Sequence, residues 1–370
     1  MKFGVHFQIP CGPGQAPADR YRDTIDQAVY AETLGYESVW PVEQHFSPAS
    51  SIVPSPLILL AAIAARTRAL RLGTGVILLP LAHPLRVAED VATLDLLSGG
   101  RVDCGVGRGM DPAHFAGYGV DQSESAARLE EGVQILRTAL IGERFSYHGQ
   151  FHQLQDAMLA PAPVQRPHPP IRVAANSSQT LEWAGGQGLP VLVAAHVNPM
   201  PRLIEMVDGY RRARAAAGHA TSPDDVTVLA PVYTARPVEQ LRADMEPGFR
   251  WLDDTAVAKL RQWRAAAPAG PEGDATRRRL DELAANFARS DFDGMSRDRA
   301  IVDTPDGCVD RLRALGERVG AGRVICWFNV GGLLPDRVVR AAMELFAAEV
   351  MPGLERAAPQ GNKMVALQRA

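Results

Sequence analysis

The first hydrophobic pattern along the chain is a strict alternation from Lys2 to Ile9, which is typical of a β-strand. Apolar side chains at positions 3, 5, 7 and 9 share one face, and residues 4, 6 and 8 share the other. In a parallel barrel the first face would meet helices and the second would point inside. The chain is therefore expected to open on a barrel strand.

A strand–helix–strand unit is predicted between Leu70 and Met110. Two short runs rich in Leu, Ile and Val, Leu70–Pro80 and Arg101–Gly107, flank a segment, His83–Leu97, with apolar residues at helical spacing. A helix that crosses between two short hydrophobic strands implies a parallel sheet.

Further strands are predicted by the same criteria. The complete set begins near residues 2, 37, 70, 101, 171, 191, 226 and 323, and a helix is predicted after each strand. Eight such pairs in 370 residues predict an α/β fold of the TIM-barrel type, (β/α)8, as a single domain over residues 1–370.

Three segments interrupt this regular pattern. Phe145–Pro170 has Gly149 between two aromatic-rich halves, which predicts a small hairpin followed by a proline-rich excursion. Asp111–Glu124 is expected to be a loop. Arg236–Ile301 is charged and helical only in patches, so we expect an insertion there, near the barrel mouth.

The helix predicted at Pro54–Arg66 is apolar on nearly all sides, whereas a surface helix keeps a polar face. It is therefore expected to be buried on two sides, by the barrel and by a second subunit of a homodimer. Burial under a long loop of the same chain would give the same pattern.

Composition excludes several classes of function. There are 39 Lys and Arg against 42 Asp and Glu, a net charge of −3 without a long basic run, so nucleic-acid binding has no electrostatic support. Four scattered cysteines lack C-x-x-C spacing, which favours a reducing compartment and argues against a zinc site. No signal peptide and no run long enough to span a bilayer is visible, so we expect a cytoplasmic protein.

Barrel enzymes place their sites at the C-terminal ends of the strands. The residues selected by that rule are Glu43, Gln44 and His45 after the second strand, Thr74 and Gly75 in the third, Arg108 after the fourth, Asn176, Ser177, Ser178 and Thr180 after the fifth, and Asn329 after the eighth.

Two of these groups suggest chemistry. Ser177 and Thr180 lie at a predicted helix N-terminus, which attracts anions, and Arg108 offers a cationic fork at the neighbouring strand end. Together they resemble a phosphate site, although an ordinary helix cap and a surface arginine would leave the same pattern. His45 with Glu43 is either a proton-transfer pair or two paired loop residues.

Nothing in the sequence predicts a metal or nicotinamide site. No cluster of His, Asp and Glu has the spacing of metal ligands. The glycine-rich run Gly105–Gly109 is not a G-x-G-x-x-G fingerprint, and it follows the fourth predicted strand instead of the first.

Several motifs, in order along most of the chain, resemble the bacterial luciferase-like family of flavin-dependent monooxygenases. They are Trp40-Pro-Val-Glu-Gln-His-Phe46, Leu72-Gly-Thr-Gly-Val-Ile-Leu-Leu-Pro80 with Ala82-His-Pro84, Glu89–Asp95 with Ser98–Arg101 and Gly107-Arg-Gly109, Val173–Trp183, and Trp327-Phe-Asn-Val-Gly-Gly332. The match is lost only in roughly Arg236–Ile301.

The resemblance implies an FMN site at the barrel mouth. Arg108, Ser177 and Thr180 would hold the phosphate, with Asn176 beside them and Arg128 as a second cation. Thr74-Gly75 falls where the family has a non-prolyl cis peptide against the flavin ring, and Gly107 replaces a cysteine that flanks the flavin in luciferase.

Another departure concerns the catalytic base. The family commonly has Glu-His-His-Phe, and here the first histidine is Gln44, which cannot exchange a proton near neutral pH. Either His45 takes that role or the reaction needs no base there, so light emission from an aldehyde is in doubt.

The resemblance implies a two-component monooxygenase. Reduced FMN (FMNH2) would come from a separate NAD(P)H:flavin reductase, O2 would form a flavin C4a-hydroperoxide, and a mainly hydrophobic substrate would be oxygenated. The alternatives are an F420-dependent oxidoreductase that transfers hydride, and a non-catalytic subunit like the luciferase β chain.

Overall fold

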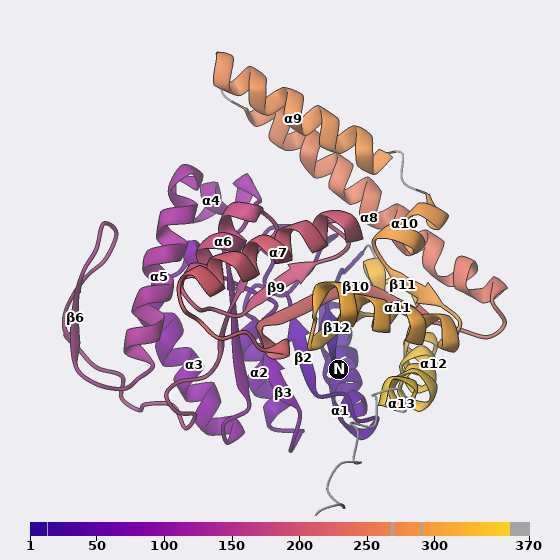
Figure 1. The fold of residues 1–370 in the computed structure, drawn as a ribbon, viewed down its shortest axis with the longest axis horizontal. Helices are drawn as coiled ribbons and strands as arrows, with labels where there is room; N and C mark the ends of the chain where they lie inside the picture. The colour runs from indigo at the N-terminus through magenta and orange to yellow at the C-terminus, as the bar shows by residue number, and fades with distance from the viewer. Residues whose placement is uncertain (13, 268–269, 289–290, 356–370) are drawn as a thin grey trace, which may run out of the picture.

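The computed structural model describes residues 1–12, 14–267, 270–288 and 291–355, and Figure 1 shows them as a barrel ringed by helices. The barrel strands are β1 (Lys2–Phe7), β2 (Ser38–Pro41), β3 (Arg71–Gly73), β5 (Val102–Gly107), β8 (Ile171–Ala174), β9 (Val191–Ala194), β10 (Val226–Thr234) and β12 (Arg323–Trp327). They are parallel neighbours in chain order, and β12 pairs with both β10 and β1, which closes the barrel. The predicted (β/α)8 fold is confirmed.

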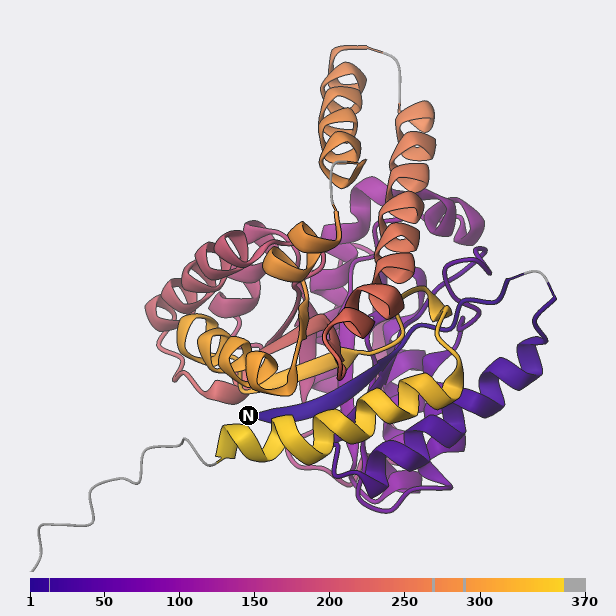
Figure 2. The same cartoon turned by 90° about the vertical axis from the view of Figure 1, so that its right-hand side faces the viewer.

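Helices cover the outside of the barrel (Figures 1 and 2). They are α1 (Pro17–Thr33), α2 (Pro56–Ala64), α3 (Pro84–Ser98), α5 (Ser125–Ala139), α6 (Ser178–Gly186), α7 (Met200–Ala216), α11 (Pro305–Val319) and α12 (Asp336–Leu345), the last extended by η5 (Phe346–Val350) and α13 (Met351–Glu355). The alternation in β1 has the predicted sense, since the rings of Phe3 and Phe346 meet edge to face at 5.2 Å. None of the helices in these ranges is long and apolar enough to cross a membrane.

Large side chains fill the barrel interior. Trp40 is fully buried there, and two glycines on the neighbouring strands make room for it. A Cβ at Gly73 would lie 2.2 Å from the indole of Trp40, and one at Gly4 would lie 2.9 Å from its Nε1. These glycines therefore fix where the largest interior side chain sits.

The predicted hairpin is present as β6 (Phe145–His148) and β7 (Gln153–Ala157), which are antiparallel. Its turn is fastened to α5 by the Glu131 carboxylate, which accepts hydrogen bonds from the backbone N–H groups of residues 150, 151 and 152. Because Glu131 is buried, the turn of the hairpin is held firmly against α5.

Two segments are more helical than predicted. Residues 236–301 contain the long helix α8 (Glu239–Ala266), α9 (Pro271–Ala288) and α10 (Phe292–Asp298), followed by β11 (Ile301–Asp303). Figure 2 shows α8 and α9 side by side, extending beyond the barrel. The expected loop at 111–124 is wrong, because α4 (Pro112–Tyr118) and the 3-10 turn η2 (Gln122–Glu124) occupy it.

Candidate functional site

The end of β2 carries a hydrogen-bonded row of side chains. His45 Nε2 lies 2.9 Å from Glu43 Oε1, and His45 Nδ1 lies 3.2 Å from the hydroxyl of Tyr118. The other Glu43 oxygen accepts the backbone N–H of Leu78 at 3.1 Å. His45 is buried, and both of its ring nitrogens are hydrogen-bonded to other side chains.

Helix α4 packs against this row of side chains. His114 Nε2 lies 3.0 Å from the carbonyl oxygen of His45 and 3.1 Å from Nε2 of Gln44. Asp111 caps the helix by accepting the N–H of Ala113. Gln44 therefore contacts α4, and no titratable group stands at its position.

Helix α8 is joined to the same cap. Lys259 Nζ lies 3.2 Å from Asp111 Oδ2, and Trp263 Nε1 donates to Asp111 Oδ1 at 3.3 Å. Partial burial by itself would raise the pKa of Asp111, but Lys259 and the Ala113 N–H lower it overall, so this carboxylate is ionised at neutral pH.

The end of β3 corrects one prediction. The non-prolyl cis peptide joins Gly75 to Val76, one residue later than the expected Thr74–Gly75 bond. Thr74 is buried, and its hydroxyl exchanges hydrogen bonds of 2.7 and 2.8 Å with the backbone of Gly105. Thr74 thus anchors β3 to β5, and the irregular backbone begins after it.

The ends of β5 and β8 lie side by side. The register pairs Val106 with Val173, so Arg108 and the N-terminus of α6 follow at adjacent positions. Arg108 is exposed and has no hydrogen bond or ion pair among the described residues. Ser177 caps α6 by accepting the N–H of Thr180, and the two hydroxyls lie 3.0 Å apart.

Two further residues that were predicted to bind the cofactor contact other groups of the protein. Arg128 pairs with Glu124 at 2.8 Å and lies over the ring of Phe151, so it presents no free guanidinium. Asn176 Oδ1 accepts the N–H of Ala194 at 3.3 Å and fastens the end of β8 to β9. A different cation, Arg202, reaches the first turn of α6 and donates to Ser178 Oγ at 3.1 Å.

The floor of the mouth is made by Trp327 between two imidazoles. The rings of His6 and His196 meet the indole edge to face, with centroids 5.5 and 5.4 Å away. Desolvation lowers the pKa of His6 to about 3 and that of His196 to about 4, so both are neutral near pH 7.

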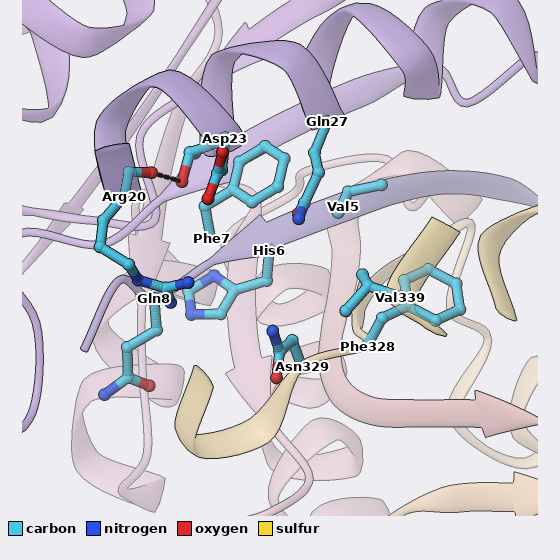
Figure 3. Close-up of a pocket in the computed structure, with 11 residues that line it drawn as sticks. Val5, His6, Phe7, Gln8, Arg20, Asp23, Gln27, Phe328, Asn329 and Val339 are labelled. Carbon is cyan, nitrogen blue, oxygen red and sulfur yellow. Dashed lines mark hydrogen bonds between the residues drawn. The ribbon is translucent and has the colours of Figure 1, made fainter. Parts of the chain in front are cut away.

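A small cavity opens beside this floor, between β1, α1 and the segment after β12 (Figure 3). Its volume is about 30 Å³, and its polar lining includes His6, Gln8, Arg20 and Asn329. This volume suits a water molecule or two and no larger ligand. Asn329 also bonds the backbone of Leu334, so its amide shapes the loop after β12.

Sequence reasoning missed Tyr118, His114, Asp111 and Arg202. The first three depend on α4, whose start was signalled by Asp111 followed by Pro112, an N-cap residue before a proline at the first helical position. Arg202 lies in α7, and only the packing of α7 against α6 brings it to Ser178.

Comparison with known proteins gives consistent matches. The family described as luciferase-like monooxygenase matches residues 1–322. The oxygenase component of the flavin-dependent trigonelline monooxygenase from Acinetobacter baylyi is 32% identical and covers 91% of each chain. The alkanal monooxygenase alpha chain of Photorhabdus luminescens is 26% identical and covers 96% of this chain and 98% of its own.

Solved structures agree in fold. The monooxygenase RslO1 from Streptomyces bottropensis superposes with a TM-score of 0.78 at 28% identity, covering 95% of this chain and 99% of that one. More distant structures show the fold alone. One is the oxygenating constituent of 3,6-diketocamphane monooxygenase from Pseudomonas putida in complex with FMN, with a TM-score of 0.76, 20% identity and coverage of 96% and 98%. Another is the F420-dependent tetrahydromethanopterin reductase of Methanopyrus kandleri, with a TM-score of 0.68, 21% identity and coverage of 95% and 99%.

Proposed function

The chain belongs to the luciferase-like family of flavin-dependent monooxygenases, and we propose that it is the oxygenase component of a two-component system. In this proposal it takes reduced FMN from a separate NAD(P)H:flavin reductase and transfers one oxygen atom of O2 to a mainly hydrophobic substrate. When bound, reduced FMN supplies the electrons that activate O2. The partner reductase is supported by the relative named as an oxygenase component.

The observation that carries the proposal is the exposed guanidinium of Arg108, which lies beside the N-terminus of α6 and has no partner in the part of the chain that the structure describes. Free backbone N–H groups and the helix dipole attract an anion there, and Ser177 and Thr180 add two hydroxyls. Arg202, which also pairs with Glu205 at 2.8 Å, brings a second guanidinium to the same turn through Ser178. This set of donors matches a phosphate monoester.

In this proposal the flavin ring lies against the wall next to this turn. Gly107 has no side chain, and a Cβ there would lie 2.6 Å from Val76 and 3.4 Å from Ala174. The cis bond at Gly75–Val76 and the short strand β4 (Ile77–Leu78), which pairs with β5, form the same wall. Gly107 thus lets Val76 pack closely against β5, and in this proposal the FMN ring lies against the wall that these residues form.

Residues 236–301 act in this proposal as an insertion that covers the mouth. The first half of α8 packs on the segment after β12, where Trp251 lies against Gly331, and its second half reaches Asp111 after β5. Because β5 stands four places from β12 in an eight-stranded barrel, α8 crosses the mouth. Such a cover excludes water from the reacting centre.

A homodimer through the predicted helix at 54–66 is part of the same proposal. The structure places α2 within that segment, and Ile58 on it is 72% exposed. Leu97 on the adjacent helix α3 is 69% exposed. These exposed aliphatic side chains on two neighbouring helices support a contact surface for another subunit.

The direct test of the phosphate site is an anaerobic titration with reduced FMN and, separately, with reduced riboflavin, which lacks the phosphate. We expect Arg108→Ala to weaken reduced FMN binding by about 1.5–3 kcal/mol, the contribution of a hydrogen bond to a charged group. Its affinity for reduced riboflavin should stay within twofold of the wild type.

The matched control is Arg86→Ala, because Arg86 is an exposed arginine on α3 that pairs with Glu89 and Asp90. It should change neither affinity. An Arg108→Ala protein that binds reduced FMN normally, or loses both ligands equally, would place the phosphate elsewhere. Tight binding of reduced F420 in place of reduced FMN would favour hydride transfer.

A further inference from the structure

Tyr118, His45 and Glu43 form a continuous row from the surface to the interior. Tyr118 is 47% exposed and its hydroxyl contacts His45 Nδ1 at 3.2 Å. His45 is buried, and its Nε2 contacts Glu43 Oε1 at 2.9 Å. The row therefore has one end open to a ligand and one end fixed.

The chemistry of the three groups orders their protons. An ionised Glu43 only accepts hydrogen bonds, so His45 Nε2 carries the proton between them. His45 Nδ1 is then an acceptor, and the Tyr118 hydroxyl donates its hydrogen bond to it. A hydroxyl, an imidazole and a carboxylate that are hydrogen-bonded in this order are the parts of a general-base relay.

The fixed end of the row adjoins the proposed flavin wall. Glu43 Oε2 accepts the N–H of Leu78, and Leu78 pairs in register with Gly107. The relay thus ends two residues beyond the cis peptide bond at Gly75–Val76. Tyr118 is joined to this wall through His45 and Glu43.

The open end of the row is surrounded by apolar surface. Phe46 is 65% exposed with its ring 5.9 Å from that of Tyr118, and Met110 is 53% exposed. Gly117 allows this arrangement, because a Cβ there would lie 2.4 Å from the Phe46 ring. An exposed aromatic ring beside the Tyr118 hydroxyl suits an aromatic ligand that has its own hydroxyl group.

We propose that Tyr118 is a catalytic residue that removes the hydroxyl proton of a phenolic or enolic substrate, with His45 and Glu43 as the groups behind it. This inference rests on the proposed function and adds a substrate class to it. It also explains how the site works with Gln44, since the proton acceptor is supplied by α4 instead.

The proton transfer needs no other reactant. The O–H bond of the substrate breaks and its proton goes to the Tyr118 oxygen, while the tyrosine's own proton forms a new bond to His45 Nδ1. The electron pair stays on the substrate oxygen, and Glu43 stabilises the imidazolium. The resulting anion makes the ring electron-rich and prepares it to accept an oxygen atom.

The test uses 4-nitrophenol as the probe, because its phenolate absorbs visible light and its phenol form does not. The full chain is first saturated anaerobically with reduced FMN, whose binding is measured separately, and the probe is added at a pH one unit below its pKa in solution. We expect the wild type to bind it mainly as the phenolate. Tyr118→Phe and His45→Gln should each lower the ionised fraction of bound probe at least threefold without changing FMN affinity.

The matched control is Tyr147→Phe. It removes a hydroxyl of the hairpin that donates a hydrogen bond to Gln134 of α5, and this variant should behave as the wild type. The inference is overturned if Tyr118→Phe ionises the probe as well as the wild type does. It is also overturned if reduced FMN binds but the probe does not. Failure to bind reduced FMN would instead remove the proposed function, and this inference with it.

Discussion

At the scale of single residues, Asp103 is the most consequential charge inside the barrel. It is buried at the end away from the mouth, with Arg71 Nε at 2.6 Å and Arg172 Nε at 3.4 Å. Burial by itself would raise the pKa of Asp103, but Arg172 and Arg71 lower it overall. Two arginines, Arg71 and Arg172, therefore pair with one buried carboxylate.

We expect Asp103→Asn to lower the free energy of unfolding by about 3–5 kcal/mol at pH 7, because it leaves Arg172 buried without its counter-charge. Urea denaturation followed by circular dichroism measures the change. Asp90→Asn is the control, since its exposed pair with Arg86 should contribute less than about 1 kcal/mol. A loss at Asp103 no larger than the control would contradict this role.

The same carboxylate predicts a pH dependence. A group with a lowered folded-state pKa stabilises the fold above its unfolded pKa, and that contribution disappears as the pH falls through the folded pKa. The wild type should thus lose stability below about pH 3.9, the ordinary aspartate value. Asp103→Asn should show a shallower slope in acid denaturation between pH 5 and the acid limit.

Contacts between side chains could be predicted from the sequence where the two residues lie close together along the chain. Glu43 and His45 are two residues apart and do contact each other. Tyr118 is 73 residues from His45, and only the path of α4 brings it there. The cis bond was predicted one residue too early, because the motif around Gly75 does not tell which of its two peptide bonds is cis.

At the scale of elements, the eight barrel strands could be predicted because each is a short hydrophobic run between loop residues. Seven-residue α4 is too short for a helical repeat to be visible. Helix α8 contains Pro247 and many charges, which interrupt the apolar pattern although the helix continues. Its course depends on contacts with the segment after β12, far away in the sequence.

The exposed face of α2 predicts the oligomeric state. We expect the wild type to sediment at twice the mass of the chain, and Ile58→Asp to sediment as a monomer, because a carboxylate would be buried unpaired at the interface. Val238→Asp is the control, since Val238 is also exposed but follows β10, opposite β3 in the barrel. A monomeric wild type would exclude this interface.

At the scale of the whole molecule, the barrel brings separate parts of the chain to one mouth. The ends of β5 and β8 supply the proposed phosphate site, β3 and β4 supply the wall, and the end of β2 with α4 supplies the relay. Helix α8 crosses above them, and its Lys259 forms an ion pair with Asp111. Different elements of one site would thus bind the cofactor, transfer the proton and exclude water.

The most direct test of this account is rapid mixing of the protein–reduced FMN complex with oxygenated buffer, followed through the return of oxidised flavin absorbance. We predict that this return is delayed at least tenfold relative to free reduced FMN, because a covered mouth keeps water from the reacting centre. A return as fast as that of free reduced FMN would contradict the proposed oxygenase function.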